Sequence, residues 1–179
     1  MVPKDIITGF DSFLFERQLQ FEAIIIGGAA LALLGVVARE TRDCDVLAPE
    51  LPTNIQEAAK EFAEKVREQG KALQDDWLNN GPTSMLPTLP AGWEHRLRLV
   101  FQGRSIVLHT LGRADLLKTK LVGLCDRGTD LGDCLALAPS AEEIDEASEW
   151  VKEQDANPDW PAYVEEVLAD LRRRLGHGV

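Results

Sequence analysis

The stretch from Phe21 to Leu47 combines an apolar run, a pair of glycines and two aspartates in one short segment. Its apolar part, residues 23–38, is shorter than the roughly 20 residues that a membrane-spanning helix needs, and it contains the glycine pair. The β-branched residues before Gly27 and Gly28 predict a buried strand, and the alanines and leucines after them favour a helix. We therefore expect a strand–turn–helix unit of a protein core and no membrane segment.

The composition bounds the class of protein. A chain of 179 residues with 45% hydrophobic residues can form one sizeable core. The net charge of -11 argues against a protein that coats nucleic acid through its overall field, although a local basic patch could still bind it. The cysteines Cys44, Cys125 and Cys134 are too sparse for a disulfide framework, and the first residues do not have the pattern of a signal peptide. We expect a cytoplasmic protein.

The hydrophobic pattern changes near residue 113. Before it, apolar periods predict a small mixed sheet with flanking helices, and after it they predict helices only. The expected fold is therefore an α/β core over residues 1–113 with a helical C-terminal part, 114–179, packed on it. Strands are expected at 22–27 and 43–48, with a hairpin of 95–101 and 105–111. Helices are expected at 4–20, 29–40, 53–70, 114–127, 129–138, 140–154 and 160–176. Gly35 and the valine pair after it weaken the end of the helix at 29–40. Ser140 and Glu143 have the spacing of a capping box, and the last helix has an apolar stripe formed by Val164, Val167, Leu168, Leu171 and Leu175. Residues 79–93 contain several turn formers and predict a loop.

The glycine pair is a candidate phosphate site. A strand that ends in Gly27 and Gly28 and leads into a helix leaves backbone N–H groups exposed, and glycine lets a phosphate approach them. Close packing of a strand against a helix also selects glycine, so the pair alone is weak evidence.

Two carboxylates follow on the next expected strand. The two-residue period places Asp43 and Asp45 on one face, where they could hold a divalent cation such as Mg²⁺. Arg39, Thr41 and Arg42 supply positive charge and a hydroxyl next to the pair, as binding of a triphosphate would require. The alternative is a solvated pair of aspartates on an edge strand.

This segment resembles the first motif of the nucleotidyltransferase superfamily, which has the DNA polymerase beta-like fold. It is most similar to the abortive-infection (AbiEii-type) toxin branch and to related bacterial nucleotidyltransferases. The residues that match that branch are Gly27, Gly28, Ala30, Leu31, Arg39, Thr41, Asp43 and Asp45. The resemblance covers about residues 21–137 and implies the α/β fold of that superfamily.

A later segment is similar to a second motif of the same branch. The matching residues are Lys120, Leu121, Leu124, Arg127, Asp130 and Asp133, with Gly123 in place of the usual alanine. Lys120 and Arg127 lie two helical turns apart and could neutralise phosphates or the charge of a transferring group. For Arg127, an ion pair with Asp130 or Asp133 on a surface helix is an equally good interpretation.

The resemblance implies a Mg²⁺- or Mn²⁺-dependent transfer of a nucleoside monophosphate from an NTP to an RNA or protein hydroxyl. It suggests tRNA as one acceptor and a toxin with a cognate antitoxin as the context. Asp43, Asp45 and Lys120 would be the catalytic residues, and Gly27, Gly28, Arg39, Thr41, Arg42 and Arg127 would bind the nucleotide.

The superfamily usually has a third carboxylate on a later strand, and the expected hairpin has none at its centre. His109 could act there as a base, but a lone histidine on a strand is more often structural. The alternatives are therefore a degenerate module of the same fold that binds nucleotide or an antitoxin without catalysis, and a purely structural interaction domain.

Overall fold

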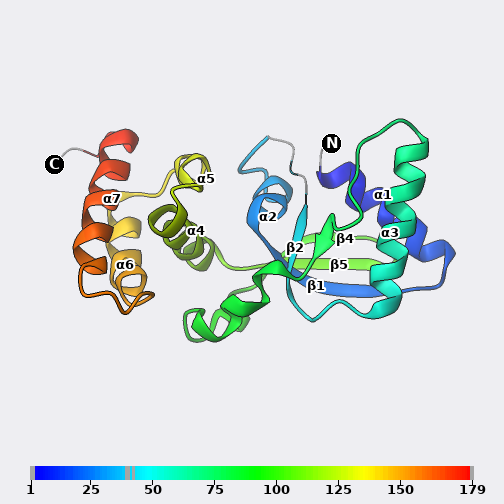
Figure 1. Ribbon diagram of the computed structural model, residues 1–179, viewed down its shortest axis with the longest axis horizontal. Coiled ribbons are helices and arrows are strands. Elements are labelled where there is room, and N and C mark those ends of the chain that lie inside the picture. The colour runs from blue at the N-terminus through cyan, green and yellow to red at the C-terminus, as the bar shows by residue number, and fades with distance from the viewer. Residues whose placement is uncertain (1–2, 39–40, 42, 178–179) are drawn as a thin grey trace. The chain divides into compact units, whose positions relative to one another are not determined.

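The computed structural model describes residues 3–38, 41 and 43–177. The chain forms two compact units (Figure 1). The first comprises Met1–Pro87 and Glu94–Leu111, and the second comprises Thr88–Trp93 and Gly112–Val179. The second unit thus begins two residues before the boundary expected from the sequence and takes in one short earlier segment.

A mixed five-stranded sheet forms the centre of the first unit, as the sequence predicts. Its order is β3-β2-β1-β5-β4, with β1 parallel to β5 and β2 parallel to β3. The pairs β1–β2 and β4–β5 are antiparallel, and the latter is the expected hairpin. The strands are β1 (Phe21–Ile26), β2 (Cys44–Ala48), β3 (Leu78–Asn79), β4 (Arg98–Gln102) and β5 (Ile106–Thr110).

The prediction of a loop over residues 79–93 is wrong in part. Asn79 belongs to the short edge strand β3, and two 3-10 helices, η1 (Gly81–Thr88) and η2 (Trp93–Arg96), follow it. Because β3 has only two residues, it is too short to leave a periodic pattern in the sequence.

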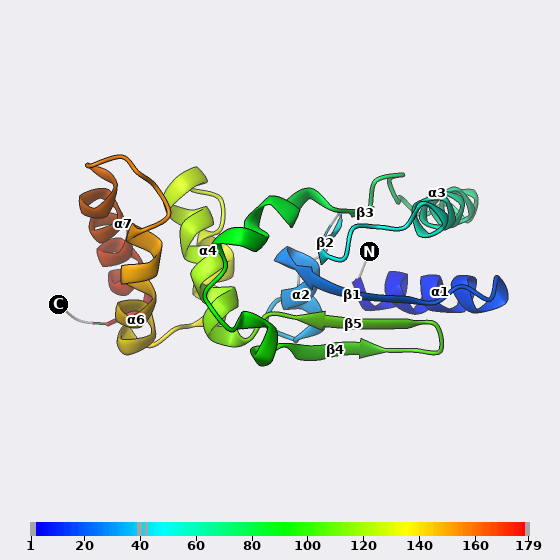
Figure 2. The same cartoon turned by 90° about the horizontal axis from the view of Figure 1, so that it is seen from below.

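Helices α1 (Pro3–Glu16) and α3 (Thr53–Glu68) lie next to each other (Figure 2). Their buried side chains join those of the strands in one hydrophobic core that contains several aromatic rings. The ring of Phe10 in α1 lies 5.4 Å from Phe62 in α3 and 5.2 Å from Trp77, measured between centroids. The indole of Trp77 also donates a hydrogen bond to the carbonyl of Ala59. Trp77 is therefore a buried anchor of the core.

Helix α2 (Gly27–Leu33) connects β1 to the segment before β2. The helix expected at 29–40 was too long, since α2 ends seven residues earlier. Gly35, just beyond it, has a φ of +74°, a left-handed conformation that glycine adopts without strain and that stops an α-helix.

A buried carboxylate joins α1 to the β4–β5 hairpin. Asp11 accepts hydrogen bonds from the backbone N–H groups of Arg104 (3.1 Å), Ser105 (2.8 Å) and Ile106 (2.8 Å). Burial alone would raise the pKa of Asp11, but these hydrogen bonds outweigh it, so the pKa lies below its ordinary value. A side chain at Gly103 would collide with this carboxylate, which explains the glycine in the turn.

The second unit contains α4 (Arg113–Arg127), α5 (Leu131–Leu137), α6 (Ala141–Lys152) and α7 (Trp160–Leu175). The apolar stripe expected on α7 supplies three fully buried residues, Val164, Leu168 and Leu171. None of the helices within the described ranges is long and apolar enough to cross a membrane.

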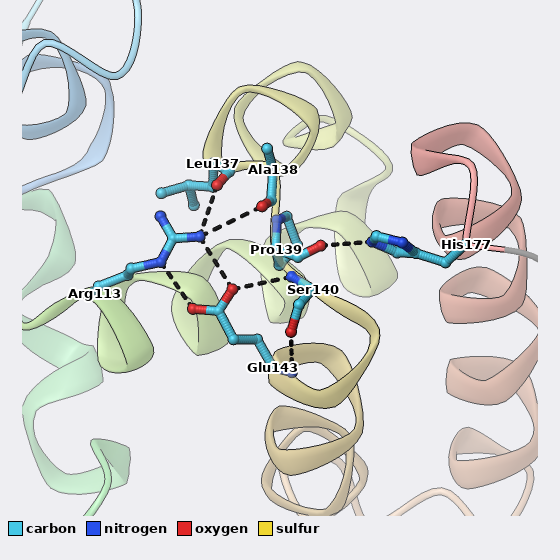
Figure 3. A network of polar contacts seen from close by, with 7 residues as sticks. All are labelled: Arg113, Leu137, Ala138, Pro139, Ser140, Glu143 and His177. Carbon is cyan, nitrogen blue, oxygen red and sulfur yellow. Dashed lines mark hydrogen bonds and ion pairs between the residues drawn. The ribbon is translucent and has the colours of Figure 1, made fainter.

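A polar network joins the ends of these helices (Figure 3). Arg113 donates to the carboxylate of Glu143 (2.8 Å from Nε) and to the carbonyl of Leu137 (2.8 Å). Glu143 also accepts from the backbone N–H of Ser140, whose hydroxyl accepts from the N–H of Glu143, so the expected capping box is present. His177, after α7, bonds to the carbonyl of Pro139 (2.7 Å). This network ties α4, α6 and the chain after α7 to the segment that follows α5.

Candidate active site

The end of β1 brings Gly27 against the carboxylate of Asp45. Ile26, the last residue of β1, pairs with Asp45 of β2, and α2 begins at the next residue. Gly27 has a φ of +75°, and a Cβ built there would lie 2.6 Å from Oδ2 of Asp45. Both the backbone conformation and the space therefore require glycine. The result is a partly buried carboxylate held against the first residue of a helix.

Asp43 and Thr41 lie just before this strand. The prediction of a strand over 43–48 holds from Cys44 onwards, so Asp43 is exposed and precedes β2. The hydroxyl of Thr41 donates to the carbonyl of Asp43 (3.0 Å), which braces the approach to the strand. The predicted convergence of both aspartates on one cation stays a prediction.

The thiol between the aspartates is inert. Cys44 is fully buried in the core, and this burial, with the negative charges of Asp45 and Asp43, raises its pKa to about 12. A thiol with such a pKa stays protonated at neutral pH, so it is a poor nucleophile there.

The other predicted residues of the first motif are placed only in part. Gly28 lies in the first turn of α2. The N-cap residue of this helix is Ile26, whose apolar side chain cannot cap the N–H groups of that turn. Arg39 and Arg42 lie outside the described residues. Their proposed role beside a triphosphate stays a prediction.

The structure adds two asparagines that the sequence did not single out. Asn79 of β3 pairs in parallel register with Asp45. Asn80 holds the end of β2, since its Nδ2 donates to the carbonyls of Val46 (3.1 Å) and Pro49 (3.1 Å). The sequence signal was the Asn-Asn-Gly turn after Trp77 and Leu78, but nothing local in it indicates pairing with residues more than 30 positions away.

The second motif forms a cluster of charges within the second unit. Lys120 is only 8% exposed, and its ammonium lies 2.9 Å from Asp130 and 2.8 Å from Asp133. Burial lowers the pKa of Lys120, but the hydrogen bonds that its ammonium donates to Asp133 and Asp130 outweigh this, so the pKa is raised and the lysine stays charged. Its predicted role in catalysis stays a prediction, and its two ion pairs connect α4 with the start of α5.

Arg127 and Gly123 complete this cluster. Arg127 lies 3.7 Å from Asp130 and 3.2 Å from Asp126, so the ion pair with Asp130 weighed as an alternative is present. Its side chain is 61% exposed, which leaves it accessible to a ligand. A Cβ at Gly123 would collide with Asp130 and lie 3.0 Å from Arg127, so glycine makes room for the cluster.

His109, the proposed substitute for a missing carboxylate, lies in β5. Its Nδ1 is 3.9 Å from the exposed carboxylate of Glu22, a long contact for an ion pair. Within the described residues, no group of three or more histidine, cysteine, aspartate or glutamate side chains could hold a metal ion. A cation at the first motif would therefore rely on the two aspartates and on ligands from the substrate or water.

A family model described as "Nucleotidyltransferase of unknown function (DUF6036)" matches residues 5–137. The match covers most of the chain, including the sheet, the Gly27–Asp45 contact and the cluster around Lys120. No curated protein matches the chain, and neither does any solved structure. The chain belongs to this family of nucleotidyltransferases.

Proposed function

From this family membership, we propose that the protein transfers a nucleoside monophosphate from an NTP to an acceptor hydroxyl. The observation that supports this most directly is the contact of Asp45 with Gly27, which places a carboxylate where the strand turns into a helix. Asp43, two residues earlier, is exposed and available to the same ligand.

The donor set fits Mg²⁺ or Mn²⁺. Mg²⁺ is usually held by one or two carboxylates, with substrate phosphates and water as its other ligands. Asp43 and Asp45 supply two such carboxylates. When bound, the cation would neutralise phosphate charge and lower the barrier to displacement at the α-phosphate.

In the reaction we propose, the acceptor oxygen bonds to the α-phosphorus while the bond from that phosphorus to the bridging oxygen breaks. Pyrophosphate leaves, and the hydroxyl proton passes to solvent. The side chains of the first motif bind and orient the triphosphate, since proximity and charge compensation supply most of the acceleration in such transfers. Gly27 and Gly28 would let phosphate approach the backbone, and Thr41 would keep Asp43 in place.

For the acceptor we propose tRNA or a protein hydroxyl, in a toxin that a cognate antitoxin restrains. The similarity of both motifs to the abortive-infection toxin branch supports this assignment, which is an analogy between families.

The second candidate is a non-catalytic module of the same fold that binds nucleotide or an antitoxin. Two observations favour it: no group of three or more histidine, cysteine, aspartate or glutamate side chains among the described residues could hold a metal ion, and Lys120 is already paired with two carboxylates.

Labelled NTPs with Mg²⁺, total cellular RNA and cell protein separate the two candidates. Transfer of label that disappears in an Asp43→Asn, Asp45→Asn double variant supports the enzyme. Thermal stabilisation by NTP without transfer to either class of acceptor supports the binding module, since a ligand stabilises the state that binds it.

A further inference from the structure

The residue beside Asp45 on the next strand is Asn79. The two residues are register partners in the parallel pair of β2 and β3. Register partners project their side chains from the same face of a sheet, and neighbouring strands lie about 4.8 Å apart. Gly27 contacts Asp45 from the side of β1. Gly27, Asp45 and Asn79 therefore form a row across three neighbouring elements.

The hydrogen bonds of Asn79 fix which end of its amide is available. The backbone N–H of Gly81 donates to Oδ1 of Asn79 (2.8 Å), so the amide oxygen faces the turn. Nδ2 has a single contact within the described part of the chain, with the carbonyl of Asp76 at the long distance of 3.5 Å. An amide nitrogen carries two N–H donors, so at least one remains for a ligand.

Asn80, the next residue, provides the contrast. Its Nδ2 donates to two carbonyls, and its Oδ1 accepts from the N–H of Leu51 (2.7 Å). Both of its N–H donors and its amide oxygen thus bond to β2 and to the backbone just after it. Of the two adjacent asparagines, only Asn79 has a donor group that the fold leaves nearly unused.

We infer that Asn79 is a nucleotide-binding residue whose Nδ2 donates a hydrogen bond to a phosphate oxygen of the NTP. This inference rests on the proposed function, in which Asp45 holds the cation that neutralises the triphosphate. A cation held by Asp45 would draw the phosphates of the NTP to this end of the sheet, where Nδ2 of Asn79, one strand away, would lie within their reach. A donor is also the group that suits an anion, whereas an unused acceptor would have suited the cation.

Two substitutions test the donor while preserving the turn. Asn79→Ser keeps an oxygen that can accept from Gly81 but lacks the amide nitrogen, and it adds no charge. Asn79→Asp keeps the acceptor and replaces the donor with a charged oxygen. The control is Asn80→Ser, which removes contacts that hold β2 and none that we assign to the nucleotide.

The measurement is isothermal titration of each purified protein with ATP, GTP, CTP and UTP in Mg²⁺, without acceptor. Wild-type protein is expected to bind at least one NTP, and Asn79→Ser to bind it about tenfold more weakly, as loss of a hydrogen bond to a charged group predicts. Asn79→Asp should bind more weakly still, with a thermal midpoint close to that of wild type. Asn80→Ser should be less stable, but its folded form should bind as wild type does.

Wild-type affinity in Asn79→Ser would overturn the inference even if Asn79→Asp binds weakly, because an added negative charge repels phosphate from a distance. The proposed function fails separately: it is refuted if wild-type protein binds no NTP, or if Asp45→Asn binds NTP as tightly as wild type.

Discussion

Replacing Gly27 with alanine tests whether the carboxylate of Asp45 must lie close to the backbone at Gly27 for activity. Two costs are expected. A non-glycine residue in the left-handed region costs about 1–2 kcal/mol, and Gly27 has a φ of +75°. The new Cβ would also lie 2.6 Å from Oδ2 of Asp45, so the carboxylate must retreat by most of an ångström to reach ordinary van der Waals contact.

Gly35 offers a matched control in the same unit. Its φ is +74°, and a Cβ built there meets nothing within 4 Å. Gly35→Ala should therefore lower the free energy of unfolding by the backbone term alone, about 1–2 kcal/mol. Gly27→Ala should lose at least as much, and denaturant unfolding measures both.

The two variants should differ most in function. Misplacing a reacting or positioning group by about 1 Å can cost on the order of 100-fold in rate, so we expect Gly27→Ala to lose most nucleotidyl transfer. Gly35→Ala should transfer label as wild type does, once both proteins are assayed well below their unfolding transitions. Equal activities in the two variants would refute the argument that the carboxylate against Gly27 belongs to the active site.

Two further predictions concern stability. Because the pKa of Asp11 is lowered in the folded protein, its stabilising effect is present above its ordinary pKa of 3.8 and is lost as the pH falls through the folded value. Asp11→Asn should thus lower the free energy of unfolding by about 2–3 kcal/mol at pH 7. In urea titrations below pH 4, the difference in this free energy between the variant and wild type should shrink. A difference that does not change with pH would contradict the lowered pKa of Asp11. Lys120→Ala should lower the free energy of unfolding by about 3–5 kcal/mol, because it removes a cation from two carboxylates of low exposure. Arg127→Ala should lower it by under about 1 kcal/mol, as expected for an exposed ion pair. Similar losses in the two variants would contradict the stabilising effect that we expect from the ion pairs of Lys120.

Features encoded within a few neighbouring residues could be predicted. The capping box of Ser140 and Glu143 and the β4–β5 hairpin depend on contacts between residues close in sequence, and both are confirmed. The strand before Gly27 is confirmed for the same reason, and the helix after it is confirmed as far as Leu33.

Features that depend on distant pairing could not be predicted. In the sequence, Asp11 is one acidic residue of an expected helix, and nothing near it indicates that it accepts hydrogen bonds from backbone groups 93 to 95 residues away. Asn79 lies in a two-residue strand whose place beside Asp45 is set by the sheet. Helical spacing placed Lys120 and Arg127 on one face, but it could not show that the chain turns back after Arg127 and brings two aspartates to the lysine.

The charge balance of that cluster decides how the two motifs divide their roles. Lys120 and Arg127 carry two positive charges, whereas Asp126, Asp130 and Asp133 carry three negative ones, so the group has a net negative charge. Within it Lys120 is nearly buried and held by both aspartates, and it can neutralise a phosphate only by giving up a partner. The ion pairs of the second motif therefore connect α5 to α4. In the reaction that we propose, the charge of the triphosphate would then be neutralised at the first motif, by the proposed cation together with Arg39 and Arg42.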